Sequence, residues 1–190
     1  MTLAKQRILI TVIVLTGFIL RFWNIADLAI DHFDEGVYAF AGQWIFEPSG
    51  IRSLDPGVIA YAPPVTPVLI GLSYFFLGGA SDLAAIFPSL ICGCLSILII
   101  YWFSKKLFGT QSGLVAATLL SSSGLNIAFS RSALTDMPLV MIWLLTMLAG
   151  LNFLEKPRFR TAIVMGFCVG LCQLTKYNGF LTGVIVAITA

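Results

Sequence analysis

The sequence predicts an all-α integral membrane protein, a polytopic helical bundle, and three observations lead to this fold class. The chain of 190 residues is 58% hydrophobic and only 11% charged, and its mean hydropathy is +0.96. A soluble domain of this length has too little interior to hide so much apolar surface. Several apolar runs approach or reach the length of about 17 to 25 residues with which a helix crosses a bilayer. Most basic residues gather between these runs.

Five complete spans and the start of a sixth follow from these runs. We place them at residues 8–23, 83–103, 111–128, 137–154, 161–175 and 179–190. No small-residue cleavage site follows the first run, so we interpret it as an uncleaved anchor rather than a signal peptide. The last run reaches Ala190 without a polar end. We therefore expect residues 1–190 to be the N-terminal part of a longer transmembrane domain.

The charged residues predict the orientation of these spans, because basic residues favour the cytoplasmic side. With the spans above, seven basic residues fall on one side: Lys5, Arg7, Lys105, Lys106, Lys156, Arg158 and Arg160. Eight of the nine acidic residues fall on the other side. We expect a protein of the plasma or inner membrane with a cytoplasmic N-terminus and an external working face.

The same rule predicts a long external loop over residues 24–82. The apolar stretch 64–78 has about 15 residues between Pro63-Pro64 and Gly78-Gly79, which is short for a span. If it crossed the bilayer, the basic loops that follow it would lie outside. We expect interfacial helices at about 34–46 and 64–78 instead.

An acidic cluster begins this loop and supplies the first candidate site residues. Asp31, Asp34 and Glu35 share one side of a helical turn, and Tyr38 lies one turn beyond Asp34. Asp31 suits an N-cap, and either of the other acids would complement the helix dipole. One cap satisfies one helix, so we predict a functional role for Asp34 and Glu35. His32, the single histidine, is predicted to be an ordinary loop residue.

Three further candidates lie at the predicted external ends of later spans: Arg131, Asp136 and Lys176. A cation there would bind an anionic group, and Asp136 would orient a ligand hydroxyl or a cation. Snorkelling of the basic residues and helix capping by Asp136 are equally good interpretations. A Mg²⁺ or Mn²⁺ ion shared by Asp34, Glu35 and Asp136 is left open, since oxygen ligands suit both metals. No other cofactor and no nucleic acid is expected.

The motifs, taken in order, resemble those of a known enzyme family. They are Arg21-Phe22-Trp23, Asp34-Glu35-Gly36-Val37-Tyr38-Ala39, Pro63-Pro64, Ser130-Arg131 with Asp136-Met137-Pro138-Leu139, and Leu174-Thr175-Lys176. Together they resemble the N-terminal part of polyprenyl-phosphate-sugar-dependent glycosyltransferases of the GT-C fold, the group of protein O-mannosyltransferases and lipid A aminoarabinose transferases. The similarity extends over nearly all of the chain.

This resemblance implies an activity and partners. A sugar would pass from a polyprenyl-phosphate carrier in the membrane to an acceptor hydroxyl on a protein, lipid or glycan of the cell envelope, with inversion. Asp34 matches the family's acidic position and would be the general base, beside Glu35. Arg131 and Lys176 would stabilise the leaving phosphate, with Tyr38 and Asp136 also binding substrate. Relatives are longer, so the acceptor site is expected outside residues 1–190, and this part alone is expected to be inactive if that site is required.

One position departs from the family pattern. Many relatives carry Lys or His directly before the Pro-Pro pair, where this chain has Ala62. Arg52, Arg131 or Lys176 would then have to supply the missing cation. Two other classes stay open: a transporter or channel subunit whose external acids attract cations, and an inactive membrane scaffold.

Overall fold

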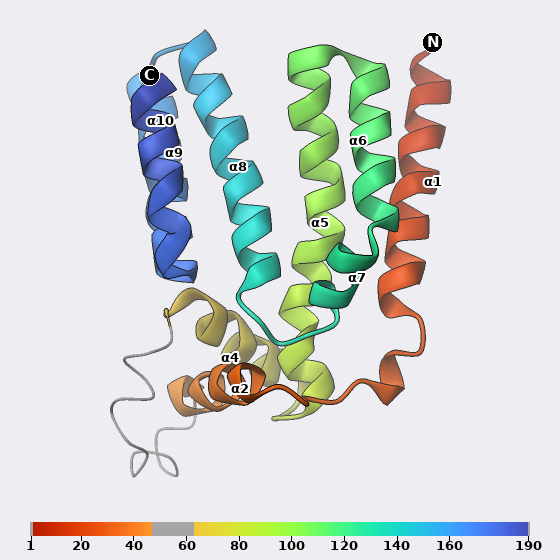
Figure 1. Ribbon diagram of the computed structural model, residues 1–190, viewed down its shortest axis with the longest axis vertical. Helices are drawn as coiled ribbons and strands as arrows, with labels where there is room; N and C mark the ends of the chain where they lie inside the picture. Colours follow the sequence, from red (N-terminus) through yellow and green to blue (C-terminus); the bar gives the residue numbers. More distant parts are fainter. Residues whose placement is uncertain (1, 47–62, 190) are drawn as a thin grey trace.

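The computed structural model describes residues 2–46 and 63–189 of the chain. Within these residues the regular secondary structure is entirely helical, which confirms the predicted all-α polytopic bundle. Most helices run along the long axis of the molecule, while α2 (Phe33–Phe46) and α4 (Val65–Leu77) lie across one end (Figure 1). Two residues that the sequence analysis discussed, Arg52 and Ala62, lie outside the described part.

The long-axis segments form the bundle and alternate in direction (Figure 1). They begin and end as follows: α1 Leu3–Phe22, α5 Asp82–Phe108, α6 Thr110–Ser122 with α7 Gly124–Ser130, α8 Asp136–Glu155, α9 Phe159–Thr175, and α10 Phe180–Thr189. The N-terminus and the turns between α5 and α6 and between α8 and α9 lie at one end. The predicted basic segments are therefore gathered at this end, which we call the basic end.

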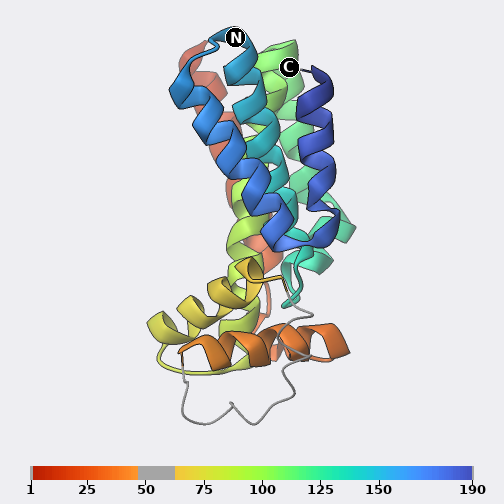
Figure 2. The same ribbon diagram turned by 90° about the vertical axis from the view of Figure 1, so that its left-hand side faces the viewer.

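The opposite end is closed by two transverse helices, α2 Phe33–Phe46 and α4 Val65–Leu77 (Figure 2). They pack on each other closely because Gly42 has no side chain. A Cβ at this position would lie 2.8 Å from Cγ2 of Ile70 and 3.0 Å from the carbonyl oxygen of Pro67. Ile70 belongs to a buried cluster that joins α2 and α4 to the first turns of α5. The two helices are thus fixed to the bundle by a common core.

Helix α5 is the central element of the bundle. It contacts α1, α4, α6, α7 and α8, and it has the largest buried share among the candidate spans. Its first turn is capped by the Ser81 hydroxyl, which accepts a hydrogen bond from the Ala84 N–H at 3.2 Å. Lys105 and Lys106 lie in its last turn, where cations complement the helix dipole.

The segment predicted as one span over 111–128 is divided in the structure. Helices α6 and α7 meet at Ser123 with a bend of 60°. The bend is stabilised by Arg21 of α1, whose side chain is fully buried. Its guanidinium donates to the carbonyl oxygens of Leu120 and Ser121, at 3.2 and 3.1 Å, which the break leaves without helical partners.

The other partners of Arg21 surround the same break. Its guanidinium also donates to the carbonyl of Gly17 at 2.9 Å, to Oγ of Ser130 at 3.2 Å and to the side-chain oxygen of Asn126. No carboxylate is among these partners, so carbonyl dipoles and neutral side chains satisfy the buried cation. These contacts give Arg21 a structural role at the break between α6 and α7.

Three helices are long and apolar enough to cross a bilayer alone: α1 with its short extension to Asp27, α5 and α8. The bent pair α6–α7 gives a fourth candidate span if the two helices count as one. The apolar helices α4, α9 and the segment Tyr177–Ile188, which contains most of α10, are shorter than these candidates. Many large apolar side chains of α1 and α9 are exposed on the outside of the bundle, as expected of a surface that faces lipid.

Candidate functional site

A polar cavity lies where α2 meets the start of α8 and the end of α9. These helix ends lie at the end of the bundle opposite the basic end (Figure 2). The cavity has a volume of about 220 Å³. Residues at the start of α2, at the start of α8 and at the end of α9 line it, together with Pro63 before α4: His32, Asp34, Tyr38, Pro63, Leu134, Thr135, Asp136, Lys176 and Tyr177. Four of the six predicted site residues are thus brought together: Asp34, Tyr38, Asp136 and Lys176.

The first turn of α2 directs Asp34 toward this cavity. The helix begins at Phe33, and Nδ1 of His32 accepts a hydrogen bond from the Asp34 N–H at 3.2 Å. His32 therefore caps the helix in the place where the sequence suggested Asp31. The Asp34 carboxylate is not needed as a cap and remains on the cavity wall. The prediction that His32 is an ordinary loop residue missed both its capping bond and its place in the wall.

Glu35, the neighbour of Asp34, points into the protein instead of the cavity. Its side chain is 2% exposed. One carboxylate oxygen accepts hydrogen bonds from the N–H groups of His32 at 3.1 Å and Asp31 at 3.4 Å, and the other accepts from the Ala133 N–H at 2.6 Å. Three backbone donors compensate the cost of burying this charge. The carboxylate ties the start of α2 to the loop before α8.

Asp136 and Lys176 form an ion pair on the cavity wall. Nζ of Lys176 lies 2.9 Å from Oδ1 of Asp136, and the two side chains are 37% and 33% exposed. A pair with this exposure contributes about 1 kcal/mol or less to stability. Its effect is to hold an ammonium group at a defined place, between the first residue of α8 and the C-cap of α9.

Arg131 is turned away from the cavity. Its Nη1 donates to the carbonyl oxygen of Arg21 at 2.9 Å and also to that of Trp23. These carbonyls belong to the last turn of α1 and its C-cap, which lack helical partners. The arginine thus caps α1 and leaves Lys176 as the cation of the cavity among the described residues.

The three suggested metal ligands do not all come together. In residues 2–46 and 63–189, no group of three or more His, Cys, Asp or Glu side chains is arranged to hold a metal ion. Asp34 and Asp136 share the cavity wall, while the backbone donors described above bind both oxygens of Glu35. The structure thus brings two of the three suggested ligands to the cavity.

Sequence reasoning missed several cavity residues, chiefly Tyr177 and Thr135. Both are direct neighbours of residues that it singled out, Lys176 and Asp136. Proximity in sequence to these charged residues was the available signal. It was not used because neither side chain is charged.

Fold and site together define a polytopic α-helical membrane protein with two carboxylates and one ammonium group in a cavity at one end of its bundle. Comparison with known families then identifies the group. This chain belongs to the dolichyl-phosphate-mannose-protein mannosyltransferase family, whose family model matches residues 61–190. The resemblance that the sequence motifs indicated is thereby confirmed. The matched range contains Asp136 and Lys176 and begins after Asp34.

Two curated relatives come from two strains of Mycolicibacterium smegmatis. Each is described as a polyprenol-phosphate-mannose–protein mannosyltransferase and is 29% identical to this chain over 128 residues. The aligned region covers 65% of this chain and 24% of each relative, so the chain matches about a quarter of the length of these proteins. No solved structure matches the chain.

Proposed function

We propose that this chain forms the N-terminal part of a membrane glycosyltransferase that moves a sugar from a polyprenyl-phosphate carrier to an acceptor hydroxyl. The names of the family and of the relatives favour mannose as the sugar and a protein as the acceptor. The observation that carries the proposal is that Asp34, Asp136 and Lys176 line the same cavity. A base and a cation in one cavity are what transfer from a phosphate ester requires.

In the proposed reaction, the carboxylate of Asp34 takes the proton of the acceptor hydroxyl as its oxygen attacks the anomeric carbon. The bond between this carbon and the phosphate oxygen breaks, and polyprenyl phosphate leaves with the electron pair. Attack opposite the leaving group inverts the anomeric centre, and no covalent intermediate on the protein is needed. The leaving group is already a phosphate, so charge stabilisation is more useful than a strong acid.

Lys176 is the proposed partner of the carrier phosphate. Arg131 binds carbonyl oxygens of the α1 terminus. Among the described residues that line the cavity, Lys176 alone is a lysine or arginine. Its ammonium group would compensate for the absence of a cation at Ala62. Asp136 would orient this ammonium toward the phosphate, and Tyr38 would contact substrate from the wall of α2.

We also propose that the cavity lies on the external side of the membrane. The basic end carries the residues that favour the cytoplasm, and the cavity lies at the opposite end of the bundle (Figure 1). In this arrangement the long-axis segments lie within the bilayer and α2 and α4 lie at its external surface. A cysteine placed at exposed Asp31 should react with a membrane-impermeant thiol reagent from outside intact cells. Reaction only after lysis would reverse the orientation.

Substitution of the proposed base tests the chemistry. Asp34→Asn keeps the size of the side chain and removes its basicity, so we expect transfer of the sugar by the full-length enzyme to fall by roughly 100-fold or more. Binding of the polyprenyl-phosphate sugar should change little, because Asp34 does not contact the phosphate in this mechanism. Asp31→Asn, three residues away and exposed, is the matched control and should retain activity.

Sugar transfer, donor binding and ion flux together distinguish the glycosyltransferase from the transporter interpretation. Wild-type turnover in Asp34→Asn would remove Asp34 as the base. Wild-type protein that catalyses ion flux in liposomes and binds no polyprenyl-phosphate sugar would instead support the transporter interpretation.

A further inference from the structure

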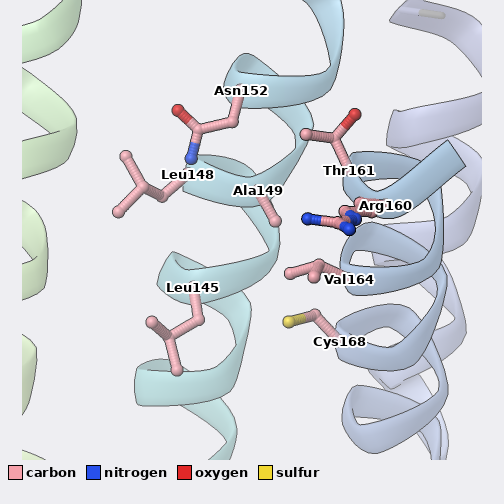
Figure 3. Close-up of a pocket in the computed structure, with 8 residues that line it drawn as sticks. All are labelled: Leu145, Leu148, Ala149, Asn152, Arg160, Thr161, Val164 and Cys168. Atoms are coloured by element: carbon pink, nitrogen blue, oxygen red, sulfur yellow. The ribbon is translucent and has the colours of Figure 1, made fainter. Parts of the chain in front are cut away.

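A second cavity lies between α8 and α9 (Figure 3). Its lining comes from residues 145–152 of α8 and 160–168 of α9, toward the turn that joins these helices at the basic end. Its volume is about 320 Å³, at the lower end of the range of roughly 300–1,000 Å³ typical of ligand sites. It is lined by Leu145, Leu148, Ala149, Asn152, Arg160, Thr161, Val164 and Cys168. None of these residues lines the candidate active site.

The cavity combines an apolar wall with one cation. Figure 3 shows Leu145, Val164 and Cys168 along its length, and Arg160 from the first turn of α9 with its guanidinium pointing across the cavity toward Ala149 of α8. In the described part of the chain, Arg160 makes no hydrogen bond and no ion pair. Arg160 is exposed, and a guanidinium at the opening of an apolar cleft favours an anionic partner that also has an apolar part.

The other polar groups at the cavity have partners within the protein. The side-chain oxygen of Asn152 accepts a hydrogen bond from Nζ of Lys106 at 2.9 Å. The hydroxyl of Thr161 accepts from the Arg158 N–H at 3.1 Å and lies 2.8 Å from the Arg158 carbonyl. Arg160 is therefore the cationic group at this cavity that is available to a ligand.

The charge around the cavity selects the sign of that ligand. The described residues of the basic end include seven basic side chains. The acidic residue described at the same end is Glu155, and its carboxylate is already paired with Lys106 at 2.6 Å. Basic groups next to membrane spans attract anionic lipids, because the charge of the lipid headgroup complements theirs. A neutral helix packed into the cleft would leave Arg160 without a counter-ion.

We propose that this cavity binds an anionic phospholipid. Its phosphate is held by Arg160, and the upper part of one acyl chain lies between α8 and α9, against Leu145, Val164 and Cys168. The exposed ring of Phe159 at the start of α9 suits the headgroup level, where aromatic side chains are common. This lipid site is independent of the proposed transfer reaction and lies toward the opposite end of α8 from Asp136.

Native mass spectrometry of the purified 190-residue protein tests the site. The protein is first reconstituted with equal amounts of phosphatidylglycerol and phosphatidylcholine of the same chain length and then extracted in mild detergent. We expect retention of phosphatidylglycerol in preference to phosphatidylcholine. Arg160→Gln should reduce the retained phosphatidylglycerol roughly tenfold, because a charge-assisted contact is lost. Lys156→Gln removes the same charge from a residue that does not line the cavity and should have little effect.

Cys168 gives a second measurement that locates the lipid. Added phosphatidylglycerol should slow the alkylation of Cys168 by N-ethylmaleimide, read by peptide mass spectrometry, and phosphatidylcholine should slow it less. Cys94 lies on α5 outside this cavity and is the internal control, with no expected change. Protection of Cys168 should be lost in Arg160→Gln.

Three results would overturn the proposal. They are equal retention of the two lipids by the unsubstituted protein, an equal loss of phosphatidylglycerol in Arg160→Gln and Lys156→Gln, and alkylation of Cys168 that does not respond to lipid. The first two would indicate a general charge effect or ordinary lipid contact. The third would favour closure of the cleft by protein, for example by a helix of another chain.

Discussion

Oε1 of Glu35 accepts a hydrogen bond from the backbone N–H of Ala133 at 2.6 Å, across 98 residues of sequence. The carboxylate is buried, and its second oxygen binds N–H groups at the start of α2. Ala133 lies three residues before Asp136, so this bond sets how the first turn of α2 lies relative to the first turn of α8. Asp34 and Asp136 reach the same cavity partly because of it.

Substitution of Glu35 should affect stability before chemistry. Glu35→Gln replaces a charged acceptor of three N–H groups with a neutral amide, so we expect a loss of about 2–3 kcal/mol of unfolding free energy. Thermal unfolding in detergent measures this loss. Transfer activity should fall without a change in its pH profile, because Glu35 does not exchange protons with substrate. A Glu35→Gln protein of unchanged stability and altered pH profile would instead make Glu35 part of the chemistry.

Substitution of Lys176 should weaken donor binding and transfer together. Lys176→Gln removes the cation of the cavity and leaves Asp136 without its partner at 2.9 Å. We expect the affinity for a polyprenyl-phosphate sugar to fall roughly tenfold, as is typical of a lost charge-assisted contact. Stability should change by about 1 kcal/mol or less, since the ion pair is partly exposed. Lys176→Arg keeps the charge and should retain most of the affinity; unchanged donor binding in Lys176→Gln would exclude the proposed role.

The buried Arg21 should be essential for the bend between α6 and α7. Arg21→Met leaves the carbonyls of Leu120 and Ser121 without donors, and we expect a loss of roughly 2–4 kcal/mol, because each buried acceptor without a donor is costly. Hydrogen exchange of the α7 amides should accelerate more than that of the α8 amides. Arg21→Lys should rescue only part of the loss, because one ammonium cannot replace a planar group with five donors. Arg7→Met, at an exposed position of the same helix, should unfold like wild type.

Two glycines offer a matched test of helix packing. A Cβ at Gly93 on α5 would lie 2.9 Å from Cβ of Ser130 and 3.1 Å from Nε of Arg21, whereas one at Gly166 on α9 would meet nothing within 4 Å. Gly93→Ala should therefore destabilise the protein by about 1–3 kcal/mol. Gly166→Ala should stabilise it by about 0.5–1 kcal/mol, since alanine is the better helix former. Thermal unfolding of both variants checks the predicted opposite signs, and a loss of similar size in both would contradict the close approach of α5 and α7.

Individual residues show how far sequence reasoning reached into the site. It grouped Asp34 with Glu35 because one cap satisfies one helix, which left both acids without a structural role. Successive side chains of a helix diverge by about 100°, and in the structure one acid faces the cavity while the other is buried. It also grouped Arg131 with Lys176, but Arg131 is close enough to the end of α1 to cap it. Sequence spacing could not distinguish these alternatives.

The sequence by itself determined that this is a helical membrane protein with its basic and acidic residues at opposite ends, because hydropathy and charge pattern along the chain decide which segments can enter lipid. Tertiary structure alone decided which charged groups share a cavity. A carboxylate or a guanidinium offers the same acceptors or donors to a helix end as to a substrate. The partner that each one meets depends on how segments about 100 residues apart pack against each other, as Glu35 meets Ala133 and Arg21 meets Ser121.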